Sequence, residues 1–174
     1  VESFTFSSQA DLEGFDYQYA YVNETAQLLE FDPPSGEEGY AERTWSGEEL
    51  DYFEVELRVR VNASSDIVSA PAVYLEWWLP LNSTHALMGA AGLQVSSYGD
   101  VLLCTLTPDG LGTDCQLVGS VPPSGWILFQ VDRSTIAAID SETGQLIGSI
   151  QTVLAPSPGA PRVSLLMMPL WRAG

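Results

Sequence analysis

Three glutamates lie on two strand-like segments of the chain, where their spacing could support acid–base chemistry. Glu54 and Glu56 alternate in "YFEVELRVRV", and Glu76 follows in "YLEWWLP". Side chains two residues apart on a β-strand project from one face at about 6.5–7 Å. Retaining glycosidases use two carboxyl groups about 5–5.5 Å apart. A carboxylate pair on such a strand could therefore supply a nucleophile and a general acid.

The neighbours of these glutamates argue against that role. Arg58 and Arg60 follow on the same predicted strand face and would keep both carboxylates ionised. A general acid instead needs its pKa raised by an apolar pocket. Two glutamates followed by two arginines on one strand face are typical of a solvated sheet with cross-strand ion pairs. His85 is the only histidine and no G-x-S-x-G motif occurs, so we expect no enzymatic activity.

The aromatic residues around Glu76 allow a second interpretation, which is sugar binding. Tyr74, Glu76 and Trp78 alternate and would share one strand face. The two rings could stack on sugar rings while Glu76 accepts hydrogen bonds from sugar hydroxyls. The alternative is that Trp77 fills the core and Trp78 packs beneath a loop, and the sequence leaves both interpretations open.

The segments that must position these residues follow the two-residue period of β-strands. Turn signals such as "PDGLG", "VPPSG" and "DSETG" separate them at short intervals. No stretch of twelve residues keeps a helical period without Gly or Pro. The apolar segment after "APSPGAP" is expected to rejoin the sheet, and "YQYAY" would place Tyr17, Tyr19 and Tyr21 on one face. We expect residues 1–174 to form one domain, an all-β, antiparallel two-sheet jelly-roll β-sandwich.

The charge of the chain excludes several classes of partner. Asp and Glu number 23 against six Lys and Arg, and the net charge is -17. Such a chain repels phosphate backbones and anionic membrane surfaces, so nucleic acid is not an expected partner. The longest apolar runs are far below the roughly 20 residues that span a bilayer. The chain does not begin with Met, as expected of a product whose signal was removed.

The cysteines and sequons indicate secretion. Cys104 and Cys115 flank "TLTPDGLGTD", a predicted hairpin that would place them opposite each other. A disulfide there would stabilise the fold by about 3 kcal/mol and implies an oxidising compartment. Sequons begin at Asn23, Asn62 and Asn82, each next to a predicted turn or strand end. We therefore expect an extracellular or cell-surface glycoprotein.

The sequence does not predict a cofactor. Two cysteines and one histidine do not provide the four ligands of a zinc site. Calcium is the alternative, held by loop oxygens of Asp32, Glu37 and Glu38 or of Asp109 and Asp114. Neither group follows the regular spacing of a calcium-binding loop.

Four segments resemble the concanavalin A-like lectin/glucanase superfamily, which includes laminin-G-like modules and laminarinase-type glucanases. They are "FTFSSQADLEGF", "YFEVELRVRV", "APAVYLEWWLP" and "GWILFQVDRSTIAAIDSETGQLIGSI". In the last, the superfamily's D-G-x-x-I-G-S hairpin is matched loosely by Asp140, Gly144, Ile147, Gly148 and Ser149.

The resemblance implies a jelly roll whose concave face often binds glycans. It does not extend to the E-x-D-x-E strand that carries the chemistry of the glucanases. Here Arg58 follows Glu54 and Glu56 at the place of the third carboxylate, and the segment precedes the strand expected to carry that motif.

Three functional hypotheses remain from these observations. The first is a secreted, non-catalytic structural subunit of a cell-surface layer or extracellular filament, which binds other copies or cell-surface partners. The N-terminal "VESFTFSSQ", with Phe4 and Phe6, is predicted to be a short alternating strand that could detach and complete the sheet of a neighbour. The alternative is a carbohydrate-binding module that uses Tyr74, Glu76 and Trp78. A glycoside hydrolase is the third and weakest hypothesis.

Overall fold

The computed structural model describes residues 4–34, 36–44, 52–58, 67–81, 84–96, 99–107, 109, 112–122, 125–132, 135–151 and 160–171. For parts of four strands (β5, β6, β7 and β13) it describes the backbone alone. The elements are η1 (Gln9–Leu12), a 3-10 turn, and β1 (Asp16–Gln18), β2 (Ala20–Asn23), β3 (Leu28–Phe31), β4 (Gly39–Thr44), β5 (Tyr52–Arg58), β6 (Ile67–Leu81), β7 (Thr84–Val95), β8 (Asp100–Leu106), β9 (Thr113–Ser120), β10 (Trp126–Asp132), β11 (Thr135–Asp140), β12 (Leu146–Gln151) and β13 (Ala160–Trp171).

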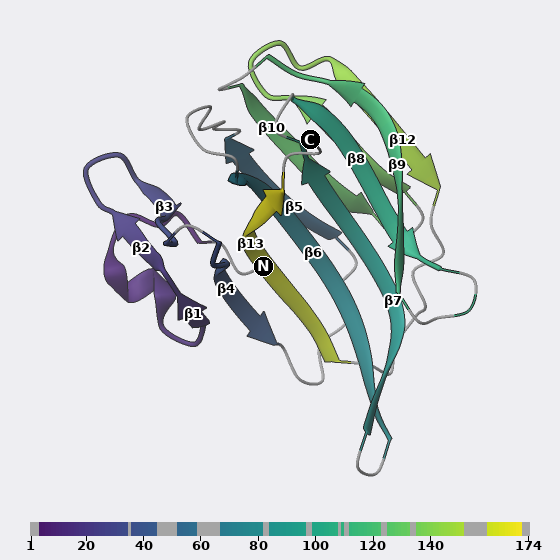
Figure 1. Cartoon of the computed structure of the whole chain (residues 1–174), viewed down its shortest axis with the longest axis horizontal. Coiled ribbons are helices and arrows are strands. Elements are labelled where there is room, and N and C mark those ends of the chain that lie inside the picture. The colour runs from purple at the N-terminus through teal and green to yellow at the C-terminus, as the bar shows by residue number, and fades with distance from the viewer. Residues whose placement is uncertain are drawn as a thin grey trace.

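The strands form two large antiparallel sheets and one small one. The seven-stranded sheet has the order β1-β4-β13-β6-β7-β8-β9, and the four-stranded sheet has the order β12-β11-β10-β5. β2 and β3 pair separately as a hairpin. Figure 1 shows the two large sheets as stacked layers, with the small hairpin beside β1 and β4. The predicted all-β, antiparallel jelly-roll sandwich is confirmed.

The core lies between the two large sheets, where alternate residues of each strand point inward. Val73, Leu75 and Leu93 are buried there from the seven-stranded sheet, and Phe129 and Ile136 from the four-stranded sheet. Since successive side chains of a strand point to opposite faces, Tyr74, Glu76 and Gln94 belong to the outer face of the seven-stranded sheet.

Two late segments adopt the predicted structure. β13, the segment after "APSPGAP", rejoins the large sheet between β4 and β6. β11 and β12 pair as a hairpin, and the Asp140 carboxylate accepts hydrogen bonds from the backbone N–H groups of Glu142 at 2.9 Å and Thr143 at 3.1 Å. Gly144 has a φ of 72°, a left-handed conformation that glycine adopts without strain.

Two expectations for the N-terminal part of the chain are wrong. Tyr17, Tyr19 and Tyr21 do not share one strand, because Tyr19 adopts a φ of 51° and separates β1 from β2. Tyr17 lies in the seven-stranded sheet opposite Ala41, whereas Tyr21 lies in the small hairpin.

The N-terminal segment, expected to be a strand, forms none over its described residues 4–9. The rings of Phe4 and Phe6 instead lie 5.2 Å and 6.5 Å from the ring of Phe15. The Arg43 guanidinium lies 4.9 Å from the centroid of Phe4 and 5.6 Å from that of Phe15. Aromatic and cation–π contacts thus hold this segment against the sandwich.

Candidate functional site

A row of directly paired residues crosses all strands of the seven-stranded sheet on its outer face. In spatial order the row consists of Asp16, Glu42, Ser164, Tyr74, Gly92, Cys104 and Cys115. Directly paired residues of antiparallel strands project from the same face. The sheet therefore gathers carboxylates, hydroxyls, an aromatic ring and a disulfide that lie far apart in the sequence.

Tyr74 lies at the centre of this row, and its ring extends over Gly92 on the neighbouring strand. A Cβ atom at position 92 would lie 2.5 Å from two ring carbons of Tyr74. A glycine inside a strand often marks such a close approach. The absence of a side chain at Gly92 thus gives the tyrosine ring its place on the sheet.

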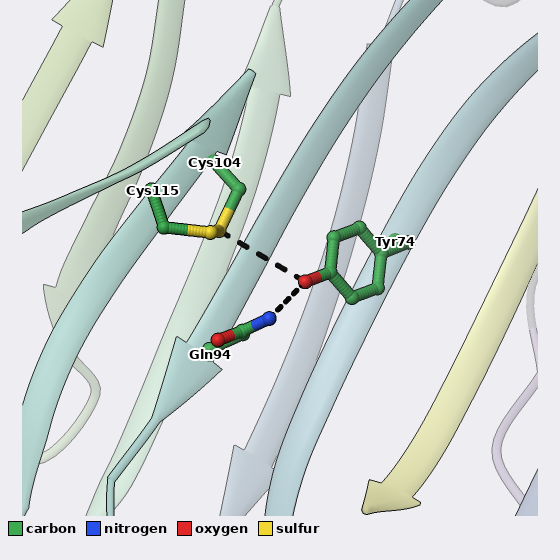
Figure 2. The surroundings of a disulfide bond; sticks show 4 residues. All are labelled: Tyr74, Gln94, Cys104 and Cys115. Atoms are coloured by element: carbon green, nitrogen blue, oxygen red, sulfur yellow. Dashed lines mark hydrogen bonds between the residues drawn. A yellow bond between two sulfur atoms is a disulfide. The ribbon is translucent and has the colours of Figure 1, made fainter. Parts of the chain in front are cut away.

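The Tyr74 hydroxyl is held at the far end of the ring. The side-chain amide of Gln94 donates a hydrogen bond to it, and the hydroxyl itself points to Cys104 Sγ at 4.0 Å. Figure 2 shows the tyrosine directed towards Gln94 and the disulfide. The ring thus lies against Gly92 at two adjacent carbons, and Gln94 holds its hydroxyl.

The surroundings of Tyr74 also affect its ionisation. Burial raises the pKa of the Tyr74 hydroxyl, and the negative charge of Glu76 acts in the same direction. Hydrogen bonds with Gln94 and Thr113 lower the pKa in part. Because the net shift is upward from about 10, the hydroxyl is neutral at physiological pH and both donates and accepts hydrogen bonds.

The predicted disulfide between Cys104 and Cys115 is confirmed. The two residues are directly opposite each other on β8 and β9. Cys104 is fully buried and lies beneath the end of the tyrosine side chain. The disulfide thus fixes the edge strand β9 to the sheet at the row that carries Tyr74.

Glu42 and Ser164 form the other side of the row. The hydroxyl of Ser164, which is only 3% exposed, donates to Glu42 Oε1 at 3.2 Å. Glu42 lies on β4 and Tyr74 on β6, with β13 between them. Two strand spacings separate them by about 9–10 Å, which is comparable to the length of a disaccharide.

Tyr74 and Glu76 share one strand face, as the sequence predicted, and this is the outer face of the seven-stranded sheet. Glu76 is partly buried, and its backbone pairs with Arg162 on one side and Ala90 on the other. The side chain of Trp78 lies outside the described part of the chain; its backbone pairs with Leu87 and Ala160.

Glu54 and Glu56 lie on the opposite side of the sandwich from Glu76. Both are exposed on the outer face of the four-stranded sheet, while Val55 between them packs against the core. Gln130 Nε2 donates to Glu54 Oε2 at 2.8 Å, and the Ser141 hydroxyl donates to Glu56. These two glutamates therefore do not share a site with Glu76.

The acidic loops proposed for calcium do not gather into a metal site within the described residues, where no three His, Cys, Asp or Glu side chains converge. Asp109 Oδ1 accepts a hydrogen bond from the Thr107 hydroxyl at 2.6 Å. Asp114 pairs with Thr105 in the β8–β9 hairpin. In the loop after β3, Asp32 bonds through its backbone N–H to the carbonyl of Tyr19 at 3.0 Å.

Of the three sequons, the structure describes the one at Asn23. Asn23 is the last residue of β2, directly before the turn over residues 24–27. Asn62 and Asn82 lie outside the described residues. Within the described chain, no helix has the length and apolar character needed to cross a membrane.

Comparison with known proteins finds similarity in structure and not in sequence. No family model and no curated protein matches the chain. The β-glucanase of Bacillus licheniformis has a TM-score of 0.50 at 14% identity, covering 87% of this chain and 70% of that one. The CBM2 module of the evolved Dit of Lactobacillus casei BL23 phage J-1 has a TM-score of 0.51 at 10% identity, with coverages of 91% and 74%. The Emp46p carbohydrate recognition domain has a TM-score of 0.52 at 12% identity, with coverages of 92% and 84%.

These similarities establish the fold of the chain. The protein has the concanavalin A-like jelly-roll fold, as the resemblance of its strand pattern implied. At identities of 10–14% the comparison extends to the fold alone.

Glu42, Gln94 and Ser164 were not singled out in the sequence. Gln94 stands between Leu93 and Val95, two fully buried residues, and this alternation could have placed it on the outer face. Ser164 gave no such signal, because it sits within an apolar run. The pairing of β13 with both β4 and β6 is what brings Ser164 and Glu42 beside Tyr74.

Proposed function

We propose that this protein is a secreted, non-catalytic carbohydrate-binding β-sandwich, and that the outer face of its seven-stranded sheet is the glycan-binding surface. The observation that carries the proposal is the ring of Tyr74, fixed over Gly92 and flanked on the same face by Glu76 and Gln94.

The chemistry of this face suits a sugar. The C–H groups on one face of a pyranose pack against an aromatic ring, and the hydroxyl of a tyrosine can also form a hydrogen bond with the hydroxyl groups of the sugar. Glu42 and Glu76 offer carboxylate acceptors for sugar hydroxyls, and the Gln94 amide offers a donor and an acceptor. A few fixed polar groups around an apolar surface are what orient a small ligand.

The fold adds support of a general kind. A carbohydrate recognition domain, a CBM2 module and a β-glucanase share the architecture of this chain. The carboxylate arrangement favours binding over hydrolysis, because Glu54 and Glu56 lie on the far sheet and contact Gln130 and Ser141. The disulfide supports secretion, since such bonds persist in oxidising compartments.

A glycan array followed by calorimetric titration tests the proposal. We expect oligosaccharide binding that Tyr74→Ala weakens at least about tenfold, or about 1.4 kcal/mol. The matched control is Gln130→Ala, which removes an amide from the outer face of the other sheet and should leave binding unchanged. An array without hits, or equal loss in both variants, would contradict the proposed surface.

A structural subunit of a cell-surface layer or filament is the second candidate. Its support is the edge strand β9, on which Leu117 is 60% exposed, since exposed apolar edges invite strand pairing. The contacts of Phe4 and Phe6 with Phe15 count against exchange of the N-terminal segment. Light scattering of the protein tests this candidate, because a strictly monomeric protein would contradict it. Oligomers that persist after deletion of residues 1–9 would exclude assembly through that segment.

A further inference from the structure

The β2–β3 hairpin combines a sequon with an exposed aromatic ring. Tyr21, Asn23 and Thr25 alternate along the chain, and Asn23 begins the sequon that Thr25 completes. Val22, between the first two, is buried in the core. Tyr21 and Asn23 therefore project from the opposite, solvent-facing side of β2. Tyr21 is 44% exposed there.

A single carboxylate holds both side chains. Glu30 lies directly opposite Tyr21 in the hairpin. The Tyr21 hydroxyl donates to Glu30 Oε2 at 2.6 Å, and Asn23 Nδ2 donates to Glu30 Oε1 at 2.9 Å. Each oxygen of one carboxylate thus contacts one of the two side chains, which leave the strand at Cα positions about 6.5–7 Å apart.

The turn fixes the other atom of the asparagine amide. Asn23 Oδ1 accepts a hydrogen bond from the backbone N–H of Ala26 at 3.1 Å, inside the turn over residues 24–27. The Nδ2 atom of Asn23 carries two hydrogens, of which the Glu30 contact uses one. The second is the hydrogen that an N-linked sugar replaces, so attachment is compatible with both contacts.

From this arrangement we propose that Asn23 carries an N-linked glycan whose first sugar packs on the ring of Tyr21, with Glu30 orienting both partners. The attachment point and the ring lie on one strand face, so the sugar reaches the ring without leaving the hairpin. Packing of sugar C–H groups on the ring stabilises the glycosylated hairpin relative to the bare one. The inference rests on secretion, which is part of the proposed function, and is independent of the Tyr74 surface.

Among the described residues, the two other exposed tyrosines, Tyr17 and Tyr19, lack this combination. Tyr17 is also 44% exposed but has Tyr19 two residues on, where Tyr21 has Asn23. Tyr17 also lies on β1, in the seven-stranded sheet. It therefore serves as a matched control for loss of an exposed ring.

A double-mutant cycle in a glycosylating secretory host tests the inference. Ser64→Ala and Thr84→Ala first remove the sequons at Asn62 and Asn82, so that one acceptor remains. In that background the four proteins are the parent, Tyr21→Ala, Thr25→Ala and the double variant. Thr25→Ala removes the sequon while it keeps Asn23 and its contacts. An endoglycosidase trims the glycan to one sugar, and mass spectrometry measures occupancy.

We expect Asn23 to carry a glycan in the secreted parent. When Tyr21 is present, this glycan should lower the equilibrium constant for unfolding roughly two- to tenfold. Tyr21→Ala should abolish that gain, and Tyr17→Ala should preserve it. Ring-current shifts of the first sugar's protons should disappear with Tyr21. Unmodified Asn23 in the secreted parent, or the same glycan effect without Tyr21, would overturn the inference. Neither outcome affects glycan-array binding through Tyr74. The array therefore distinguishes a failure of the inference about Asn23 from a failure of the proposed function.

Discussion

The ring of Tyr74 covers Gly92 on the adjacent strand so closely that a Cβ atom there would lie 2.5 Å from two of its carbons. Gly92→Ala must therefore displace the ring or the strand. We expect a loss of about 1–3 kcal/mol in the free energy of unfolding, as for overpacked cores, measured by urea denaturation.

Gly112→Ala is the control for this substitution, because a Cβ atom at position 112 meets nothing within 4 Å. It should change the unfolding free energy by less than about 0.5 kcal/mol. Adding Tyr74→Ala to Gly92→Ala should remove the clash, so that the double variant is more stable than the sum of the single losses. Strict additivity would contradict the contact.

Reduction of the Cys104–Cys115 disulfide should weaken the whole fold, because the bond closes the β8–β9 hairpin beside Tyr74. We expect a loss of about 3 kcal/mol, because the unfolded chain gains conformational freedom when the loop is opened. Thermal unfolding with and without reductant measures it. A protein with both cysteines changed to serine should show no response to reductant, which separates the bond from other effects of the reagent.

Two tyrosines should titrate late in alkali. Burial raises the pKa of Tyr74, and a hydrogen bond with Glu37 raises the pKa of Tyr19. Both shifts are upward, so the linked stability is fully present below about pH 10 and is lost as pH rises through each folded-state pKa. Tyrosinate absorbance should lose one late-titrating group in Tyr74→Phe and another in Tyr19→Phe. Unchanged titration curves would contradict these assignments.

The Arg43 guanidinium over the rings of Phe4 and Phe15 should stabilise the N-terminal segment. Arg43→Met keeps an apolar side chain of similar reach and removes the charge. We expect this substitution to lower the free energy of unfolding by about 0.5–2 kcal/mol. It should also speed proteolysis within the N-terminal segment. If Phe4→Leu lowers the free energy of unfolding by the same amount in the Arg43→Met protein as in the parent, the cation–π contact contributes nothing to stability.

The alternation of apolar and polar residues was sufficient to predict the strands and the hairpin that joins Cys104 to Cys115, because these depend on neighbours in sequence. It did not predict which strands pair. Ser164 and Glu42 are 122 residues apart, and only the order of the sheet brings them together. Tyr19 was misplaced for a local reason: its left-handed backbone occurs at a residue type that rarely signals it.

β13 lies between β4 and β6 in the seven-stranded sheet, although it follows all the other described strands in sequence. In the described sheet, β1 and β4 therefore join strands β6 to β9 through residues 160–171. While the ribosome is still making the chain, β6 to β9 can form their hairpins, but Glu42 and Tyr74 have no strand to connect them. The row of paired residues on the outer face is thus complete only when residues 160–171 have been made, and in a chain terminated before residue 160 no strand would connect Glu42 to Tyr74.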